Sequence, residues 1–166
     1  MVVGGGAVAN RKARKLLQAR AKVAVISPEI APELESVAVE VHRRSYRDGD
    51  LEGASLAFAA TDVREVNAAV AREGRKLGVL VNVADDPSEG DFALPSTLRR
   101  GRLQVAVSTG GASPTLAARI RHELEGLFGA EWAGVVEELG RAREAGTKTG
   151  GEWEEVVEGC LSRLRG

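Results

Sequence analysis

A glycine-rich segment at the start of the chain has the residue types and spacing of a phosphate-binding turn. Gly4 and Gly6 are followed by Ala9, which completes the pattern G-x-G-x-x-A. The first glycine permits a tight strand-to-helix turn, the second lets the backbone approach a pyrophosphate, and the small third residue keeps the helix close to the sheet. The N–H groups and the positive dipole end of the next helix would face the phosphates. We therefore predict a dinucleotide site at Gly4 and Gly6.

The best candidate for acid–base chemistry is Asp85, which comes after the predicted buried strand 79–83 and precedes Asp86 and Pro87. Paired acids before a proline are often only turn chemistry. However, an aspartate that ends a buried strand at a cofactor-binding edge, beside a second carboxylate, would have a perturbed affinity for protons. We predict that Asp85 is a catalytic acid or base, and the turn interpretation stays open beside it.

The segments around the glycine turn have the order that a dinucleotide site requires. Residues 7–20 have apolar side chains at helical spacing, and residues 22–27 read as a second buried strand. Strand, glycine turn, helix and strand form a βαβ unit, which disfavours a turn that binds nothing. Pro28 and Glu29 follow the second strand. No Arg lies there to take a 2′-phosphate, which favours NAD over NADP.

Further strands bring polar residues to the same edge. Residues 37–42 alternate and read as a third strand, and the apolar runs 56–60 and 79–83 read as buried parallel strands with a helix over 63–77 between them. In open α/β sheets, ligands bind outside the carboxyl ends of the strands. We therefore expect four polar residues to converge where the glycine turn lies: Thr61, Asp62, Asn82 and Asp85.

The second half of the chain has a different pattern. Residues 99–102 read as a compact basic turn before a strand over 103–108. Residues 109–112 form a small polar turn whose amides could make an anion nest, and Ser113-Pro114 is a helix start. Residues 132–166 carry two thin amphipathic stripes, broken at 145–151, which would pack on this chain's core or on a second subunit.

Composition excludes several classes of protein. The net charge of −1 gives no domain-wide basic field, which argues against nucleic acid as the main partner. The one cysteine, Cys160, fits a reducing cytoplasm and excludes an internal disulfide framework. We expect no signal peptide and no membrane span. Residues 1–3 make a very short first strand, so we expect either a less supported edge of the site or a lost upstream start.

Several motifs, in order along the chain, together resemble the precorrin-2 dehydrogenase / sirohydrochlorin ferrochelatase family, which includes the N-terminal module of siroheme synthase. The resemblance runs from residue 1 to about residue 127, and the C-terminal helices match only in character. The matching motifs are Val3-Gly4-Gly5-Gly6-Ala7-Val8-Ala9 with Arg11-Lys12, Ala59-Ala60-Thr61-Asp62 with Val66-Asn67, Asn82-Val83-Ala84-Asp85-Asp86-Pro87, Asp91-Phe92 with Pro95-Ser96, and residues 105–114.

The resemblance implies a fold and an assembly. An α/β, Rossmann-like parallel-sheet NAD domain would span residues 1–94, a small dimerisation segment 95–125 and a helical C-terminal lobe 126–166, in a homodimer. Family members oxidise precorrin-2 to sirohydrochlorin with NAD, and some also insert ferrous iron to make siroheme. Both possibilities, one reaction or two, stay open.

The resemblance also implies site residues. The family's essential aspartate falls on Asp85, and its NAD contacts fall on Ala7, Val8, Pro28 and Glu29. Its serine-containing turn, a substrate contact, falls on Ser108, Thr109 and Gly110. Thr109 stands where some members carry serine, which leaves a role for that hydroxyl in doubt.

The chemistry agrees with this assignment. Oxidation of the tetrapyrrole removes a hydride to nicotinamide and a proton to a nearby base, a role that suits Asp85. The substrate of the family carries eight carboxylates, and Arg side chains pair well with carboxylates. We predict Arg99, Arg100 and Arg119, with Arg102, as its partners, beside the simpler interpretation of a solvated basic surface. No His/Cys cluster has the spacing of a resident metal site, so ferrous iron would be a substrate.

A non-enzymatic NAD-sensing module is the alternative function. It would explain the glycine turn and the helical tail. It gives no reason for Asn82-x-x-Asp85, nor for the turn at 109–111 before a capped helix. Production of NADH from precorrin-2 would separate the two hypotheses.

Overall fold

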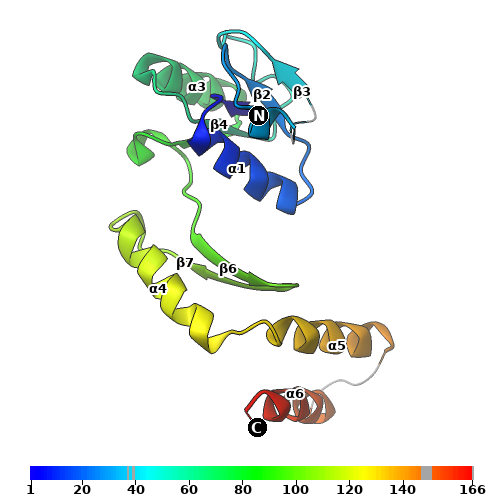
Figure 1. The fold of residues 1–166 in the computed structure, drawn as a ribbon. Helices are drawn as coiled ribbons and strands as arrows, with labels where there is room; N and C mark the ends of the chain where they lie inside the picture. Colours follow the sequence, from blue (N-terminus) through cyan, green and yellow to red (C-terminus); the bar gives the residue numbers. More distant parts are fainter. Residues whose placement is uncertain (37, 39, 147–150, 166) are drawn as a thin grey trace. The chain divides into compact units, whose positions relative to one another are not determined.

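The structure is a computed structural model that describes residues 1–36, 38, 40–146 and 151–165 (Figure 1). Its internal contacts divide the chain into two compact units, Met1–Ala93 and Leu94–Gly166. The predicted boundary between residues 125 and 126 falls within the helix Pro114–Leu127 of the second unit and stays a prediction.

The first unit is built on a parallel sheet of five strands in the order β3-β2-β1-β4-β5. This confirms the predicted Rossmann-like α/β fold. The strand order reverses between β1 and β4, which is the place where such sheets bind ligands. The strands are β1 (Val2–Val3), β2 (Ala24–Ile26), β3 (Glu40–His42), β4 (Leu56–Ala59) and β5 (Leu80–Val83).

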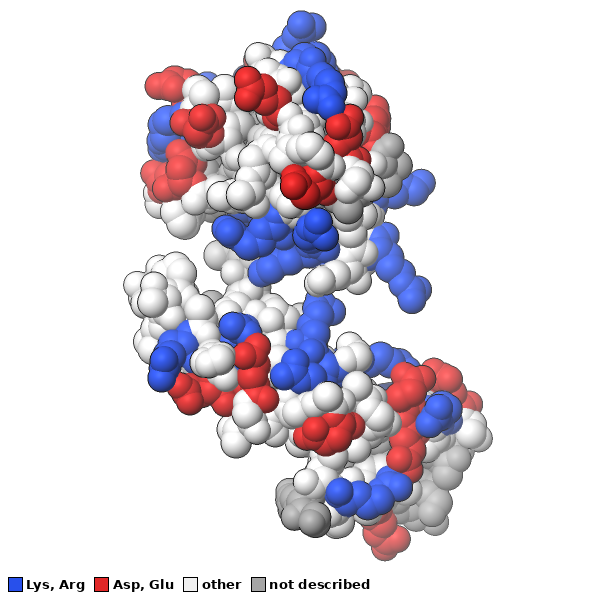
Figure 2. All heavy atoms as spheres, viewed as in Figure 1, with Lys and Arg blue, Asp and Glu red and all other residues white. Residues whose placement is uncertain are grey.

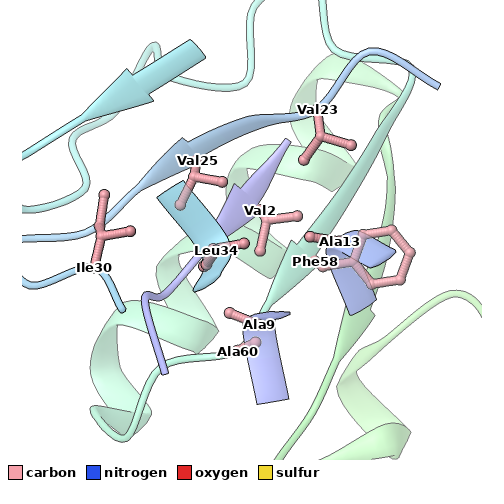
Figure 3. Close-up of a cluster of buried hydrophobic side chains, with 9 residues drawn as sticks. All are labelled: Val2, Ala9, Ala13, Val23, Val25, Ile30, Leu34, Phe58 and Ala60. Atoms are coloured by element: carbon pink, nitrogen blue, oxygen red, sulfur yellow. The ribbon is translucent and has the colours of Figure 1, made fainter. Parts of the chain in front are cut away.

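Hydrophobic clusters cover both faces of this sheet. Alternation along β1 sends Val2 to one face and Val3 to the other, and both are buried. Val2 packs with α1 (Ala7–Gln18) and α2 (Pro32–Glu35) in the cluster of nine buried side chains shown in Figure 3. Val3 packs in a second cluster with α3 (Arg64–Leu77). The short first strand is therefore the centre of both cores.

The second unit consists of a hairpin and three helices. The hairpin pairs β6 (Ser96–Arg100) antiparallel with β7 (Leu103–Val107). It packs against α4 (Pro114–Leu127), and α5 (Trp132–Glu144) packs against α6 (Gly151–Arg165). Ser113 caps α4 as predicted, because its hydroxyl accepts a hydrogen bond from the Leu116 N–H at 3.1 Å.

The predicted basic turn at residues 99–102 is wrong in part. Arg99 and Arg100 lie in β6, opposite Gln104 and Leu103, and the chain reverses only at Gly101, where φ is +55°. Two adjacent arginines are not typical of a strand. This strand is recognised from its pairing with β7. The predicted break at 145–151 includes residues 147–150, which lie outside the described residues. Among the helices that the structure describes, none has the length and apolar character to cross a bilayer.

A buried carboxylate ties the long connection before β4 to α3. Glu73 is 6% exposed and accepts hydrogen bonds from the N–H groups of Gly49 and Leu51, at 3.0 and 3.1 Å, and from the Tyr46 hydroxyl. Burial, followed by the hydrogen bond to Glu73, raises the pKa of Tyr46 far above its ordinary range. The connection therefore depends on one side chain of α3.

Replacing Glu73 by Ala should lower the free energy of unfolding by about 3 kcal/mol, since it leaves the buried Leu51 N–H, the Gly49 N–H and the Tyr46 hydroxyl without their acceptor. Tyr46→Phe is the matched variant, because it removes one donor and leaves both backbone bonds, and should cost about 1 kcal/mol. Urea unfolding followed by circular dichroism measures both. Equal stability of Glu73→Ala and the unaltered chain would contradict this account.

Candidate functional site

A cleft of about 850 Å³ opens at the carboxyl ends of β1, β2, β4 and β5. It brings together the glycine turn, the start of α1 and the loops that follow the three other strands. The residues that line it are Gly4, Gly5, Gly6, Ala7, Val8, Arg11, Lys12, Ser27, Glu29, Ile30, Ala31, Ala60, Thr61, Asp62, Ala84 and Asp85.

The three glycines of the turn have different reasons to lack a side chain. At Gly4, where φ is +124°, a Cβ would lie 2.3 Å from the Ala60 carbonyl oxygen. At Gly5 a Cβ would lie 1.8 Å from the Glu29 carbonyl oxygen, a constraint that the G-x-G-x-x-A pattern does not reveal. At Gly6 a Cβ would meet nothing within 4 Å. Gly4 and Gly5 are therefore required by packing, and Gly6 leaves room for a ligand.

The N-terminus of α1 is suited to an anion. Gly6 is its N-cap and provides no side-chain cap, and the first turn holds no acidic residue. Ala9 is fully buried against the sheet, as the motif predicts. The first N–H groups of the helix, at Ala7 and Val8, therefore present the positive end of its dipole at the cleft.

A second hollow of about 350 Å³ adjoins the cleft and shares Ser27, Glu29, Thr61 and Asp62 with it. Its walls combine apolar and acidic side chains, as an adenosine group would require. The remaining residues that line it are Val3, Ile26, Pro28, Ser45, Tyr46, Val63 and Val66. All predicted cofactor residues except Asn82 therefore line one or both hollows.

Asp85 is held by a fully buried amide on α3. The Asn67 Nδ2 donates to the Asp85 Oδ1 at 2.8 Å and to the Thr61 carbonyl at 3.0 Å. The Asn67 Oδ1 accepts from the Thr61 N–H at 3.1 Å and from the Thr61 hydroxyl at 2.8 Å. Asn67 therefore ties the loop after β4 to the residue that follows β5. The sequence signal that could have indicated this role is a polar residue, Asn67, on the apolar face of α3 that packs inward.

The surroundings predicted for Asp85 are wrong in two respects. Its side chain is 34% exposed rather than buried, and Arg64 lies between it and the neighbouring carboxylates. The Arg64 guanidinium lies 3.6 Å from Asp85, 3.2 Å from Asp86 and 2.6 Å from Glu89. Hydrogen bonds from Ser88 hold the pKa of Asp86 below its ordinary value. The two aspartates are therefore separate groups with different partners.

Asn82 lies behind the cleft rather than in it. It is 6% exposed, and its Nδ2 donates to the Phe92 carbonyl at 2.7 Å. Its Oδ1 accepts a hydrogen bond from the Lys12 ammonium, which lines the cleft and lies 5.5 Å from the centre of the Phe58 ring. The predicted direct contact of Asn82 with a cofactor gives way to a contact with Lys12. The sequence signal that could have predicted this contact is the spacing of Lys12, three residues after the buried Ala9, which puts both on the same side of α1.

The predicted substrate residues lie in the second unit, where most have partners of their own. The Arg100 Nε donates to the Phe128 carbonyl at 2.8 Å, and Arg119 pairs with Glu123 at 2.9 Å. Arg99 is exposed on β6, and Arg102 lies 3.8 Å from Glu144.

The turn at 108–112 closes on itself. The Gly110 N–H donates to the Ser108 hydroxyl at 3.2 Å, and the Ala112 N–H donates to the Thr109 carbonyl at 3.1 Å. The Thr109 hydroxyl accepts from the Ser113 N–H and donates to the Ser113 carbonyl, both at 3.0 Å. Two amides of the predicted anion nest are therefore already used. Among the described residues, no three His, Cys, Asp or Glu side chains group to hold a metal.

The glycine geometry generates a matched pair of variants. Gly6→Ala should fold normally but bind NAD at least about tenfold more weakly, because its methyl group would occupy the space that a pyrophosphate needs. Gly5→Ala should instead fail to fold or melt far lower, since its Cβ would overlap the Glu29 carbonyl. Thermal melting and NAD titration by calorimetry distinguish them. A Gly6→Ala variant that binds NAD normally would show that the pyrophosphate lies elsewhere.

Comparisons with known proteins agree with this geometry. Residues 1–96 match the family described as "Putative NAD(P)-binding", and residues 100–127 match the family described as "Sirohaem biosynthesis protein central". A solved structure of "SirC, precorrin-2 dehydrogenase" superposes with a TM-score of 0.75 at 28% identity, over 95% of this chain and 81% of that one.

Curated relatives are longer proteins. Siroheme synthase 2 of Aeromonas salmonicida is 43% identical over 146 residues, which are 87% of this chain and 30% of that protein. Siroheme synthase of Chromobacterium violaceum is 40% identical over 173 aligned positions, an alignment that covers 98% of this chain and 37% of that protein. The chain thus spans about a third of the length of these relatives. It belongs to the putative NAD(P)-binding family, carries a match to the sirohaem central family after it, and is similar to the N-terminal portion of siroheme synthase, as its motifs indicated.

Proposed function

We propose that the chain is an NAD-dependent dehydrogenase that oxidises precorrin-2 to sirohydrochlorin. The observation that carries the proposal is that one cleft contains both the phosphate-binding turn at Gly6 and the carboxylate of Asp85. The solved relative named as a precorrin-2 dehydrogenase supports the choice of substrate.

The residues of the cleft fit an NAD molecule. The open space at Gly6 and the N–H groups of Ala7 and Val8 would hold the pyrophosphate. The adjoining hollow would hold the adenosine half, with Glu29 placed to accept hydrogen bonds from the ribose hydroxyls. No Lys or Arg is among the residues that line that hollow, which favours NAD over NADP. When bound, NAD supplies the acceptor for the hydride.

Asp85 is the group proposed to take the proton. As the hydride leaves precorrin-2, the carboxylate accepts the proton that the substrate loses, and the products are sirohydrochlorin, NADH and one proton. Asn67 and Arg64 orient this carboxylate from two sides. Arg64 and Asn67 both lie on α3, so the helix fixes the base relative to the sheet.

Replacing Asp85 by Ala should lower the turnover number by at least about a hundredfold while NAD binding is unchanged, because the residue acts on the tetrapyrrole. Asp86→Ala is the matched control, since Asp86 is the adjacent carboxylate and is not among the residues that line the cleft. Anaerobic incubation with precorrin-2 and NAD, followed by NADH absorbance, measures both. Unchanged turnover in Asp85→Ala would remove this residue from the mechanism.

The same assay decides between the enzyme and the NAD-sensing alternative. The unaltered protein should form NADH only when precorrin-2 and NAD are both present. NAD binding without any NADH would favour the sensor. Insertion of ferrous iron into sirohydrochlorin stays a prediction of the resemblance, in which Asp85 would accept pyrrole protons. A metallated absorbance spectrum after supply of sirohydrochlorin and ferrous ion would decide it.

The surface of α4 supports the proposal of a homodimer. Leu116, Ile120 and Leu127 are spaced to share one face of this helix and are exposed, Leu127 to 70%. A second copy of the chain would bury this face.

Substituting Ile120 and Leu127 by Glu should convert a dimer to a monomer, since two charges would enter the contact. Ala118→Glu is the control, because Ala118 is exposed on the opposite side of α4. Sedimentation velocity reads the result. A monomeric unaltered protein, or a double variant that remains dimeric, would contradict the proposed contact.

A further inference from the structure

A group of basic side chains on α1 has no part in the proposed hydride transfer or in the pyrophosphate contact. Four residues of this helix are basic and none is acidic, and Figure 2 shows Lys and Arg gathered over this side of the first unit. Two of the four, Arg11 and Lys12, line the cleft. Neither forms an ion pair with an acidic side chain among the described residues.

Lys12 is the better placed of the two. Lys12 is half-buried as a residue, and its ammonium group lies over the Phe58 ring and donates to the Asn82 Oδ1. The Asn82 amide cannot turn without loss, because its Nδ2 already donates to the Phe92 carbonyl at 2.7 Å. A lysine has three donors, and one is used by Asn82. The structure therefore holds a positive charge in one place at the wall of the cleft.

This positive charge is costly as it stands. Burial, then the nearby charges of Arg11 and Lys15, lower the pKa of Lys12. No acidic side chain within the described part of the chain pairs with Lys12 to offset that cost. An anionic group of a ligand would do so, and a carboxylate is the anion that a lysine and an arginine together bind well.

The position of Lys12 separates this anion from the pyrophosphate. Its partners Phe58 and Asn82 lie opposite each other on β4 and β5, and Asp85 follows β5. The adenosine hollow is lined by residues that follow β2, β3 and β4, and neither Lys12 nor Asp85 is among them. Lys12 and the proposed base therefore line the same cleft outside the adenosine hollow, and the substrate must lie in that cleft during proton transfer.

We infer that Lys12, with Arg11 beside it, binds a peripheral carboxylate of the tetrapyrrole substrate and so sets the position of the ring relative to Asp85. This inference rests on the proposed function. It assigns the contact with a substrate carboxylate to α1. The sequence predicted Arg100 and Arg119 for such a contact, but both already have partners within the second unit. Asn82 acts through Lys12 as a positioning residue.

The test compares Lys12→Met with Lys12→Arg. Methionine keeps the apolar packing on Phe58 and removes the charge, so the KM for precorrin-2 should rise about 10- to 100-fold. The turnover number at saturation and the Kd for NAD should stay within about threefold of the unaltered values. Lys12→Arg keeps the charge, so its KM for precorrin-2 should return most of the way to the value of the unaltered protein. Arg14→Gln is the control, because Arg14 is exposed, bonds to Asn10 and does not line the cleft.

Three outcomes would overturn the inference. An unchanged KM in Lys12→Met would show that no substrate carboxylate binds there. A parallel rise in the Kd for NAD would assign Lys12 to the pyrophosphate instead. A fall in turnover without a change in KM would place Lys12 in the chemical step.

A binding measurement separates this inference from the proposed function. Uroporphyrin carries eight carboxylates and coproporphyrin four, and absorbance titration gives their Kd values without any reaction. The unaltered protein should bind uroporphyrin more tightly, and Lys12→Met should reduce that preference. If NADH never forms but the preference is lost in Lys12→Met, the reaction is wrong and the carboxylate site stands. If NADH forms and Lys12→Met binds both porphyrins normally, the site is wrong and the reaction stands.

Discussion

The close approach of backbone to backbone at the glycine turn is the constraint on which the site depends. Gly4 lies against the Ala60 carbonyl and Gly5 against the Glu29 carbonyl, closer than any side chain would allow. These contacts bring the ends of β1, β2 and β4 to one point. Only with that geometry does α1 begin at the mouth of the cleft, with its N–H groups directed into it. The next glycine, Gly6, is then free to face a ligand.

A second link carries this geometry to the candidate base. The buried amide of Asn67 uses its donors and acceptor on Thr61 and Asp85, so it links the loop after β4 to the residue that follows β5. The phosphate-binding turn and the carboxylate are 81 residues apart between Gly4 and Asp85, yet rigid contacts join them. A dehydrogenase needs this precision, because a hydride and a proton leave one substrate toward two different groups.

The sequence predicted the fold and the turn because both depend on periodicity and on residue size. Apolar runs such as 56–60, closed by polar residues, are typical of strands buried on both faces, and Gly4 and Ala9 have spacing that few other structures require. The strand β6 was not predicted, because its stability comes from pairing with β7 and two adjacent arginines suggested a turn. The exposure of Asp85 and the inward direction of Asn82 were not predicted. They depend on Arg64 and Lys12, partners that are distant in the sequence.

A crystal structure of the protein with NAD and sirohydrochlorin tests the central claim most directly, since it shows both ligands against the same residues. The account predicts the pyrophosphate against Gly6 and the first turn of α1, and the tetrapyrrole between the nicotinamide and the carboxylate of Asp85. A dinucleotide bound away from the glycine turn, or a tetrapyrrole out of reach of Asp85, would contradict it.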